Sequence, residues 1–543
     1  MPTIVNSATF NPAALQADDL YIVIQPPPSF IAGVPSDVFG VVGTASWGPK
    51  NTPILLGSPA DGSAAFGPMT LESATDPHDM PTDLVLAFAQ ASGGRGSLQG
   101  YGVRVTDGTD VAATVQLKDV ATPTAANGLE VDALYSGKQG NNIQVVISTG
   151  GNTNSWTVTV VGFIGSTAEV YPNIPTAGFW AALKNAFANG LSGVRGPSQL
   201  VRGGTVGAST LAPATGTFTL TGGTDGRAVT TANLTGSDTT VPKTGMYALR
   251  SLIPAVGVAW IAGLTDSTAY SAFAALCDGE GMLGLLTFTT GTDSQGVVTA
   301  KKGYGILSFN IAFFKDWLYF FDPVNNITRL VPPLAVAGGG ISVLRPSVSP
   351  SNKQVYGISG TERYNTTTGA IIAYSTSEVG LLESSGINVI SNPIPGGPTF
   401  GFRMGVNSSN DPVTSPIEYG RMTNWLAQSY LQFMGQVVGQ LQSTRPDDPL
   451  RSSVKLMLDG FHQILKDNLM IDDYQDICGF QQSGSAQAGY NTPTTIAQHY
   501  LFALAKVRYL ASVKFFILAL LGGTTVVTTA NSLDEALIAQ QGV

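Results

Sequence analysis

Charged side chains are scarce in this sequence. Only 12% of its 543 residues are Asp, Glu, Lys or Arg, whereas 43% are hydrophobic, and a soluble domain usually has about 25% charged residues. So much apolar material excludes a disordered chain. The net charge of −9 comes from 27 Lys and Arg against 36 Asp and Glu, and no run of basic residues occurs. A broad phosphate-binding face is therefore excluded, and we expect no direct nucleic-acid partner.

Cysteine and histidine are scarce as well. Cys277 and Cys478 lie far apart in dissimilar contexts, which favours two buried, reduced thiols over a disulfide. His78, His462 and His499 fall in unrelated segments, and no HExxH or CxxC spacing occurs. We therefore expect no metal site, and for His462 a structural role within a helix.

The sequence also lacks targeting and membrane signals. Its start has no basic region followed by an apolar run, so we expect no secretion signal and synthesis in a cytoplasm. The most apolar stretch, residues 507–527, contains Lys514 and is broken by Gly522 and Gly523. A bilayer span needs about 20 uninterrupted apolar residues, so this stretch predicts strands and no membrane insertion.

Motifs of catalysis and cofactor binding are missing or misplaced. No GxSxG or GxxxxGK[ST] pattern occurs, and the GxGxxG pattern at 279–284 follows a predicted helix and precedes a predicted strand. Dinucleotide binding needs the opposite order, so we interpret this pattern as a helix C-terminal turn. The pairs Asp447-Asp448 and Asp472-Asp473 are interpreted as solvated turn residues, with Asp448 near a helix N-cap. We therefore predict no catalytic, metal-binding or cofactor-binding residue and no enzymatic activity.

What is present is an α/β pattern interrupted by a β-rich segment. Thr, Ala, Gly and Asn dominate residues 107–226, where alternating runs at 143–148 and 156–163 predict strands and 179–188 predicts a helix. The flanking parts alternate strands with helices. Predicted helices there are 81–91, with Thr82 as a possible cap, 270–277, 417–442 and 449–469; predicted strands are 100–105 and 284–289.

The fold class expected from this pattern is α/β (α+β), a mixed-sheet core flanked by helices, with an inserted β-rich domain and extended N- and C-terminal arms. The predicted divisions are an N-terminal arm, a first core part, an inserted outer domain, a second core part, a C-terminal helical and strand region, and a C-terminal arm. Their ranges are 1–30, 31–106, 107–226, 227–405, 406–520 and 521–543.

Each end of the chain has a short apolar strand beyond a hinge. The first precedes three prolines, and the second follows Gly522 and Gly523. Strands set apart in this way suit addition to the sheet edge of another molecule. The predicted strand-exchange residues are Leu20, Tyr21, Ile22, Val23, Ile24, Thr525, Val526, Val527, Thr528 and Thr529.

Several stretches, in the same order along the chain, resemble the contractile-tail sheath proteins of myovirus-type bacteriophages. The resemblance begins in the N-terminal unit, continues through the insert and extends to the residues before the long helices. The resembling stretches are 33–35, 41–43, 47–49, Asn51, Pro53, 66–67, 133–143, 220–226, Trp317, 331–333, 337–338, 345–358, 385–390 and 400–403. Residues 406–416 and much of the insert match the family poorly.

The resemblance implies a structural subunit of a phage tail sheath. Such subunits form stacked hexameric rings around a tail tube, are linked by exchanged terminal strands and contract to drive the tube through the host envelope. The implied partners are further copies of the chain, the tail tube protein, and baseplate and tail terminator proteins. The implied location is the virion tail, assembled in the host bacterial cytoplasm.

Two other interpretations stay open at this point. The scattered carboxylates and the GxGxxG pattern leave an α/β hydrolase-like enzyme with a β-rich binding insert. The Thr-, Gly- and Asn-rich composition of 107–226 leaves a surface or host-binding β module.

Overall fold

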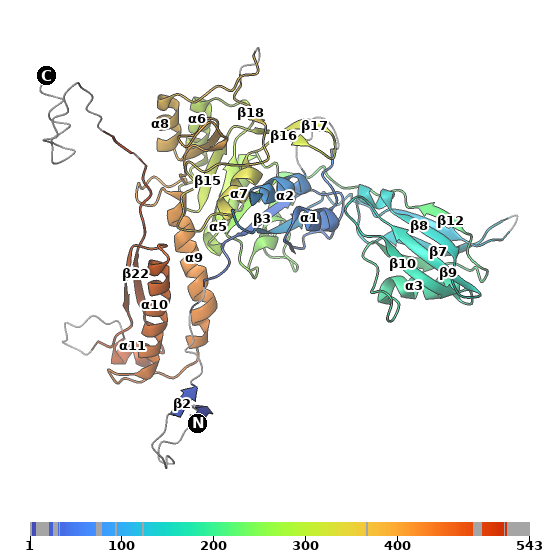
Figure 1. Ribbon diagram of the computed structural model, residues 1–543, viewed down its shortest axis with the longest axis horizontal. Helices are drawn as coiled ribbons and strands as arrows, with labels where there is room; N and C mark the ends of the chain where they lie inside the picture. Colours follow the sequence, from blue (N-terminus) through green and yellow to red (C-terminus); the bar gives the residue numbers. More distant parts are fainter. Residues whose placement is uncertain are drawn as a thin grey trace, which may run out of the picture.

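The computed structural model describes residues 3–6, 21–24, 31, 33–71, 79–92, 95–121, 124–364, 368–481, 491–514 and 516–518. The molecule is elongated (Figure 1), with a central α/β core between a β-rich unit at one end and a pair of long helices at the other. A small pair of strands from the N-terminal residues lies beyond the tips of those helices.

An eight-stranded sheet forms the centre of the core. Its order is β20-β19-β15-β14-β13-β3-β5-β4; the six inner strands are parallel, and β20 and β4 are antiparallel edges. The inner strands are apolar and almost entirely buried, as expected for a parallel sheet that is covered on both faces. The strands are β3 (Val38–Gly43), β4 (Ile54–Leu56), β5 (Gln99–Arg104), β13 (Val258–Ile261), β14 (Leu283–Thr287), β15 (Ile311–Lys315), β19 (Ile387–Ser391) and β20 (Gly401–Phe402).

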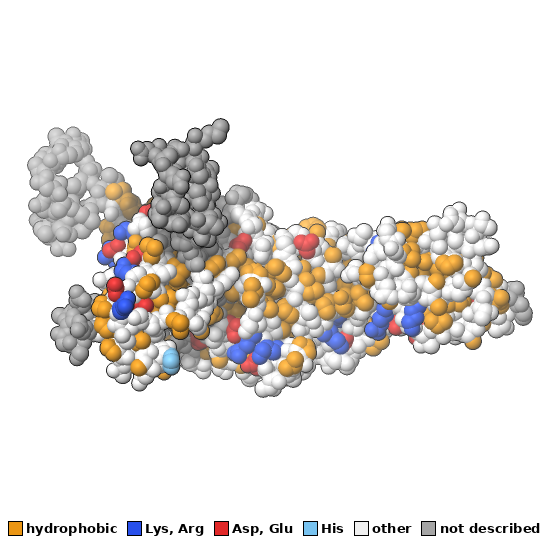
Figure 2. Space-filling model, turned by 90° about the horizontal axis from the view of Figure 1, so that it is seen from below, with side chains coloured by type: hydrophobic (Ala, Val, Ile, Leu, Met, Phe, Trp, Pro, Cys, Tyr) orange, Lys and Arg blue, Asp and Glu red, His pale blue; other side chains and the backbone are white. Residues whose placement is uncertain are grey.

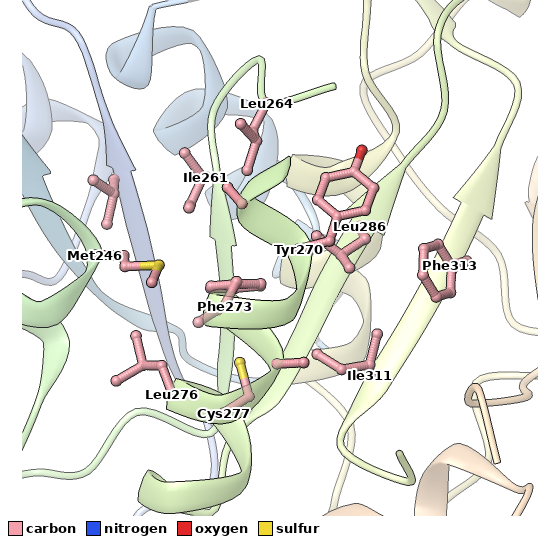
Figure 3. Packing of buried hydrophobic residues seen from close by; sticks show 14 of the residues in the cluster. Met246, Ile261, Leu264, Tyr270, Phe273, Leu276, Cys277, Leu286, Ile311 and Phe313 are labelled. Atoms are coloured by element: carbon pink, nitrogen blue, oxygen red, sulfur yellow. The ribbon is translucent and has the colours of Figure 1, made fainter. Parts of the chain in front are cut away.

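Helices cover both faces of this sheet. On one face α5 (Tyr270–Glu280), α6 (Ser294–Tyr304) and α8 (Thr376–Ser384) pack over alternate strand residues. Figure 3 shows part of this layer, with Phe273 from α5 and Phe313 from β15. On the other face lie α1 (Pro59–Phe66), α2 (Met80–Ala89) and α7 (Leu334–Ser342).

Glycine lets α7 approach the sheet closely. A Cβ added at Gly338 would lie 2.3 Å from the ring of Trp260, and one at Gly339 would lie 2.3 Å from the carbonyl oxygen of Ala87 on α2. The run Gly338, Gly339 and Gly340 therefore serves close packing of α7 between α2 and the strands, at some cost in helix propensity.

The β-rich unit has its own hydrophobic core. Two antiparallel sheets, ordered β10-β9-β8-β12 and β11-β7-β6, pack together with one helix. Its elements are β6 (Thr114–Lys118), β7 (Asn127–Ala133), β8 (Gln144–Thr149), β9 (Ser155–Val161), β10 (Glu169–Pro175), α3 (Phe179–Asn189), β11 (Val201–Val206) and β12 (Gly216–Thr219). The chain enters this unit after β5 and returns to the core before β13.

The long helices α9 (Ile417–Met434) and α10 (Pro449–Asp467) form a further core with the strands β21 (Asp473–Ile477) and β22 (Leu504–Arg508). A three-stranded sheet of β16 (Leu318–Asp322), β17 (Ile327–Val331) and β18 (Gly360–Thr361) lies beside the central sheet. The N-terminal pair is β1 (Thr3–Asn6) and β2 (Tyr21–Ile24). The remaining short helical elements are η3 (Lys138–Asn142), α4 (Thr231–Thr235), η4 (Gly245–Leu249), η5 (Ser267–Ala269), η6 (Gly435–Val437) and α11 (Pro493–Ala497).

These elements confirm the expected α/β core and the strands and helices predicted for the β-rich segment. Several local predictions were wrong. The helix expected over 417–442 ends at Met434. Asp79, not Thr82, occupies the N-cap position of α2, and Thr82 lies inside the helix and donates to the Asp79 carboxylate. Residues 59–66 form α1, where no helix was expected. The strand expected from residue 507 onward ends at Arg508, and residues 509–514 and 516–518 have no strand.

Among the helices that the structure describes, none combines the length and the apolarity that a bilayer crossing needs.

Candidate assembly surfaces

The GxGxxG pattern is a helix end. Gly281 takes a left-handed conformation (φ 66°) as the C-cap of α5 and donates its N–H to the carbonyl of Cys277, after which Leu283 begins β14. A left-handed glycine at this position is a common helix stop, so the interpretation of this pattern as a C-terminal turn is confirmed. Cys277 and Cys478 are both buried free thiols, as the sequence predicted.

The two acid pairs have different roles. Asp448 is the N-cap of α10 and accepts a hydrogen bond from the backbone N–H of Arg451 at 3.3 Å, as predicted. Asp473 is not in a turn but begins β21, where Lys466 lies 2.8 Å from its carboxylate. This hydrogen bond is the main reason that the pKa of Asp473 lies below its usual value. Capping accounts for Asp448, and surface ion pairs with Arg508 and Lys466 account for Asp472 and Asp473.

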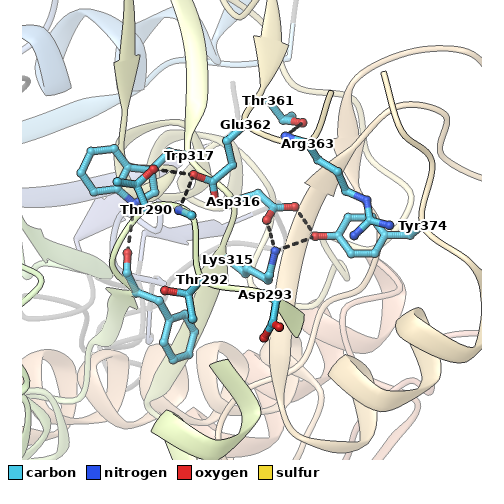
Figure 4. A network of polar contacts seen from close by, with 12 residues as sticks. Thr290, Thr292, Asp293, Lys315, Asp316, Trp317, Thr361, Glu362, Arg363 and Tyr374 are labelled. Atoms are coloured by element: carbon cyan, nitrogen blue, oxygen red, sulfur yellow. Dashed lines mark hydrogen bonds and ion pairs between the residues drawn. The ribbon is translucent and has the colours of Figure 1, made fainter. Parts of the chain in front are cut away.

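A buried polar cluster lies at the carboxyl end of β15, the edge at which open α/β sheets hold ligands. Figure 4 shows it. Lys315 and Asp316 are 6% and 2% exposed and contact each other, and the Tyr374 hydroxyl donates to Asp316. The guanidinium of Arg363 lies 3.9 Å from the centre of the Tyr374 ring. Burial, and then the charge of Asp316, raise the pKa of Tyr374.

The members of this cluster serve as partners for one another. Arg363 also donates to Glu378 at 2.9 Å, and Glu362 accepts from the Thr290 hydroxyl at 2.6 Å. These contacts fix Glu362, Arg363 and Tyr374 over the sheet edge, which is a structural role. Sequence analysis missed the cluster because its members come from segments about 60 residues apart. Within the described residues, no group of three His, Cys, Asp or Glu side chains could hold a metal ion.

A two-stranded antiparallel sheet, β21 with β22, lies against α10. Within the described part of the chain, neither strand pairs with a third, so each has one open edge. Three or more strands are usually needed for independent stability, and open edges accept further strands.

A buried chain of hydrogen bonds attaches β21 to both long helices. Nδ1 of His462 on α10 lies 2.6 Å from the Asp476 carboxylate on β21, and Nε2 lies 2.5 Å from the Tyr430 hydroxyl on α9. His462 is fully buried. The predicted structural role of His462 is confirmed, and its place in the fold is to hold the two-stranded sheet on the helices.

The N-terminal strand prediction falls on β2, which pairs with β1 in parallel, Thr3 opposite Tyr21 and Asn6 opposite Ile24. Strand structure is thus confirmed for Tyr21, Ile22, Val23 and Ile24. Leu20 and the predicted C-terminal strand Thr525, Val526, Val527, Thr528 and Thr529 lie outside the described residues. Strand exchange itself stays a prediction.

Solved structures of sheath proteins share this architecture. The sheath tail protein of Desulfitobacterium hafniense superposes with a TM-score of 0.54 at 12% identity, covering 90% of this chain and 100% of that one. A sheath tail protein of Listeria innocua superposes with a TM-score of 0.54 at 13% identity, covering 89% of this chain and 96% of that one. The sheath of an extracellular contractile injection system (PVC), in the contracted state, superposes with a TM-score of 0.51 at 12% identity, covering 94% of this chain and 99% of that one.

The chain has the tail-sheath fold. No protein-family model and no curated protein matches its sequence, so the comparisons establish the likeness through the fold alone. These three structures are matched over 100%, 96% and 99% of their own length.

The β-rich unit of this sheath fold is attached through buried polar contacts. Arg104, at the end of β5, is fully buried and donates to the carbonyl oxygens of Gly48 and Ser136 at 2.7 Å each and of Asp225 at 3.3 Å. One side chain therefore ties a core loop to both connections of the unit. The ring of Trp47 also packs edge-on against the ring of Phe163, with 5.1 Å between the two ring centres.

The outer surface of the sheath fold has few charges. Figure 2 shows one face, on which apolar and uncharged polar side chains dominate and charged side chains form small scattered groups. Covering such a surface with another protein removes few charges from water, so little desolvation opposes extensive contact.

Proposed function

We propose that this protein is the structural subunit of a contractile tail sheath of a bacteriophage. The observation that carries the proposal is the shared architecture with sheath tail proteins over about nine tenths of the chain. The proposal gains support from the order of the sheath-like motifs in the sequence and from the self-contained polar cluster at the sheet edge where an enzyme would bind its ligand.

Subunits would be joined by exchanged strands. The donors are the terminal segments, of which Tyr21–Ile24 forms a strand outside the core. The acceptor is the β21–β22 sheet, which in the described residues has two open edges on a support of helices. Backbone hydrogen bonds would supply most of the affinity of such a contact. It is heterologous, because a donor on one copy meets an acceptor on the next, so repetition gives an open helical array.

Contraction would follow from this linkage. If the exchanged strands keep subunits connected, the globular bodies can slide and rotate from a long metastable packing to a shorter, more stable one. The free energy is stored at assembly, and no nucleotide is consumed. We place the subunits in stacked hexameric rings around a tail tube protein, between a baseplate and a tail terminator, in the virion tail.

Electron microscopy of the purified protein tests the proposal directly. Hollow striated cylinders are the expected result, and isolated monomers under all assembly conditions would contradict it. Val23→Pro removes a strand N–H and is expected to abolish cylinders while leaving the fold intact. Val23→Ala, which keeps the backbone donor, is the matched control. Truncation after Gly522 tests the C-terminal donor in the same way.

A further inference from the structure

Three consecutive large apolar side chains project into solvent near the C-terminal end of the described chain. Phe516, Ile517 and Leu518 are 84%, 65% and 71% exposed. Isolated exposed apolar residues are common on protein surfaces, but a continuous run of this size marks a contact site.

An apolar groove of matching character lies at the base of the same segment. It has a volume of about 610 Å³ and runs between the start of α9 and residues 507–514. Most of its wall is apolar and includes Tyr419 and Met422 from α9, Val413 from the preceding loop, and Leu510. The lining also contains the charged side chains Glu418, Arg508 and Lys514. Val413 is 72% exposed although it lines the groove, so its apolar side chain is open to solvent there.

The triplet does not fill the groove of its own molecule. Residues up to Lys514 already form one wall, and the ammonium of Lys514 lies 3.5 Å from the carboxylate of Glu383 on α8. Phe516 is 84% exposed and is not part of the groove lining, so its ring lies in solvent outside this groove.

We propose that the Phe516–Leu518 triplet of one copy docks in the groove of a second copy, between Val413 and Leu510. This inference rests on the proposed polymerisation and names a contact beyond strand exchange, an apolar anchor at the root of the C-terminal segment. Donor and acceptor are different surfaces of the same chain, so the contact repeats without closing. Such an anchor would set the direction in which the segment leaves for its neighbour.

Cysteine cross-linking of full-length protein tests the contact. Val413→Cys and Phe516→Cys each place a thiol at an exposed position, and the native Cys277 and Cys478 are buried. Mixing the two single variants under mild oxidation is expected to give a disulfide-linked dimer joining residues 413 and 516. Val241→Cys, at a 99% exposed position away from the groove, is the matched control and should give no specific dimer with Phe516→Cys.

The outcomes separate this inference from the proposed function. If the mixture still forms cylinders but no 413–516 dimer appears, the anchor is overturned and the sheath proposal stands. The dimer without cylinders would support the contact and count against a sheath. An intramolecular 413–516 disulfide in the double variant, with no dimer in the mixture, would also overturn the inference. Phe516→Asp is expected to raise the concentration needed for polymerisation about tenfold or more, from the lost burial of one large side chain.

Discussion

Replacing Asp83 by Asn is expected to stabilise the core at neutral and alkaline pH. Asp83 lies on α2, is 4% exposed and accepts a hydrogen bond from Trp260 Nε1 at 2.8 Å. Burial is the main reason that its pKa is raised from 3.8 to about 7; the bond from Trp260 lowers the pKa, and the nearby carboxylate of Asp79 raises it. The side chain is therefore more costly to ionise in the folded protein than in the unfolded chain.

The sign and size of the effect follow from this raised pKa. As the pH rises from about 4 to about 7, the unfolded chain releases the Asp83 proton first, so the folding free energy becomes less favourable. A rise from 3.8 to about 7 corresponds to about 4 kcal/mol at 1.36 kcal/mol per pKa unit. Asn keeps an acceptor for Trp260 and has no charge, so Asp83→Asn should gain up to this amount at pH 8 and little at pH 4.

Hydrogen exchange of the α2 and β13 backbone amides is the suitable assay, because it reports the opening of this region even when different parts of a large chain unfold separately. Protection factors, corrected for the intrinsic pH dependence of exchange, should fall between pH 5 and pH 8 in the wild type and fall much less in Asp83→Asn. Asp459→Asn, on the outer part of α10, is the control. An unchanged slope in Asp83→Asn, or a loss of protection at pH 8, would refute the reasoning.

Three further substitutions test other contacts. Arg104→Ala leaves three carbonyl oxygens at the junction of the β-rich unit without their donor and should lower the stability of the junction by about 3 kcal/mol. Limited proteolysis should then be faster at that junction but not within the unit. Gly338→Ala brings a methyl group into the ring of Trp260 and should lower the free energy of unfolding by about 1–3 kcal/mol, which a lower Tm would show. The control is Gly303→Ala, where an added Cβ meets nothing within 4 Å; this substitution should not lower the Tm. His462→Ala removes the link from Tyr430 to β21 and should lower the stability of this region by roughly 3 kcal/mol. The expected observation is lost amide protection in β21. Unchanged protection there would show that the β21–β22 pair is stable without this link.

Local patterns in the sequence were sufficient for much of the fold. Alternation gave β8 and β9, and periodicity gave α3 and α10, because in these elements one face is buried and the other is solvated. For α10 the N-cap Asp448 was a further signal. Residues 59–66 were missed because their sequence is short and weakly apolar. The signal that could have found this helix is Ser58, whose hydroxyl accepts from the N–H of Asp61, followed by Pro59 at the first helical position.

The polar contacts that organise the molecule could not be predicted in the same way. Arg104 meets carbonyl groups up to 121 residues away, and His462 meets its partners on α9 and β21 only after the helical region has folded. Nothing in the spacing of these residues marks such pairs. The terminal strand 21–24 was predictable because its apolar run and its prolines are neighbours in sequence.

The placement of these contacts argues for rigid bodies with adaptable connections. Both faces of the central sheet are closed by helices, and the β-rich unit is held by Arg104 at its two connections. The strand pairs β1–β2 and β21–β22 are only two-stranded in the described chain, so they have most to gain from added strands. Rearrangement between two packings of an array would therefore act on the terminal segments and on weakly charged outer faces, while the hydrogen bonds inside each body stay made. Partial unfolding of a body during such a change would cost free energy that the new surface contacts would have to offset.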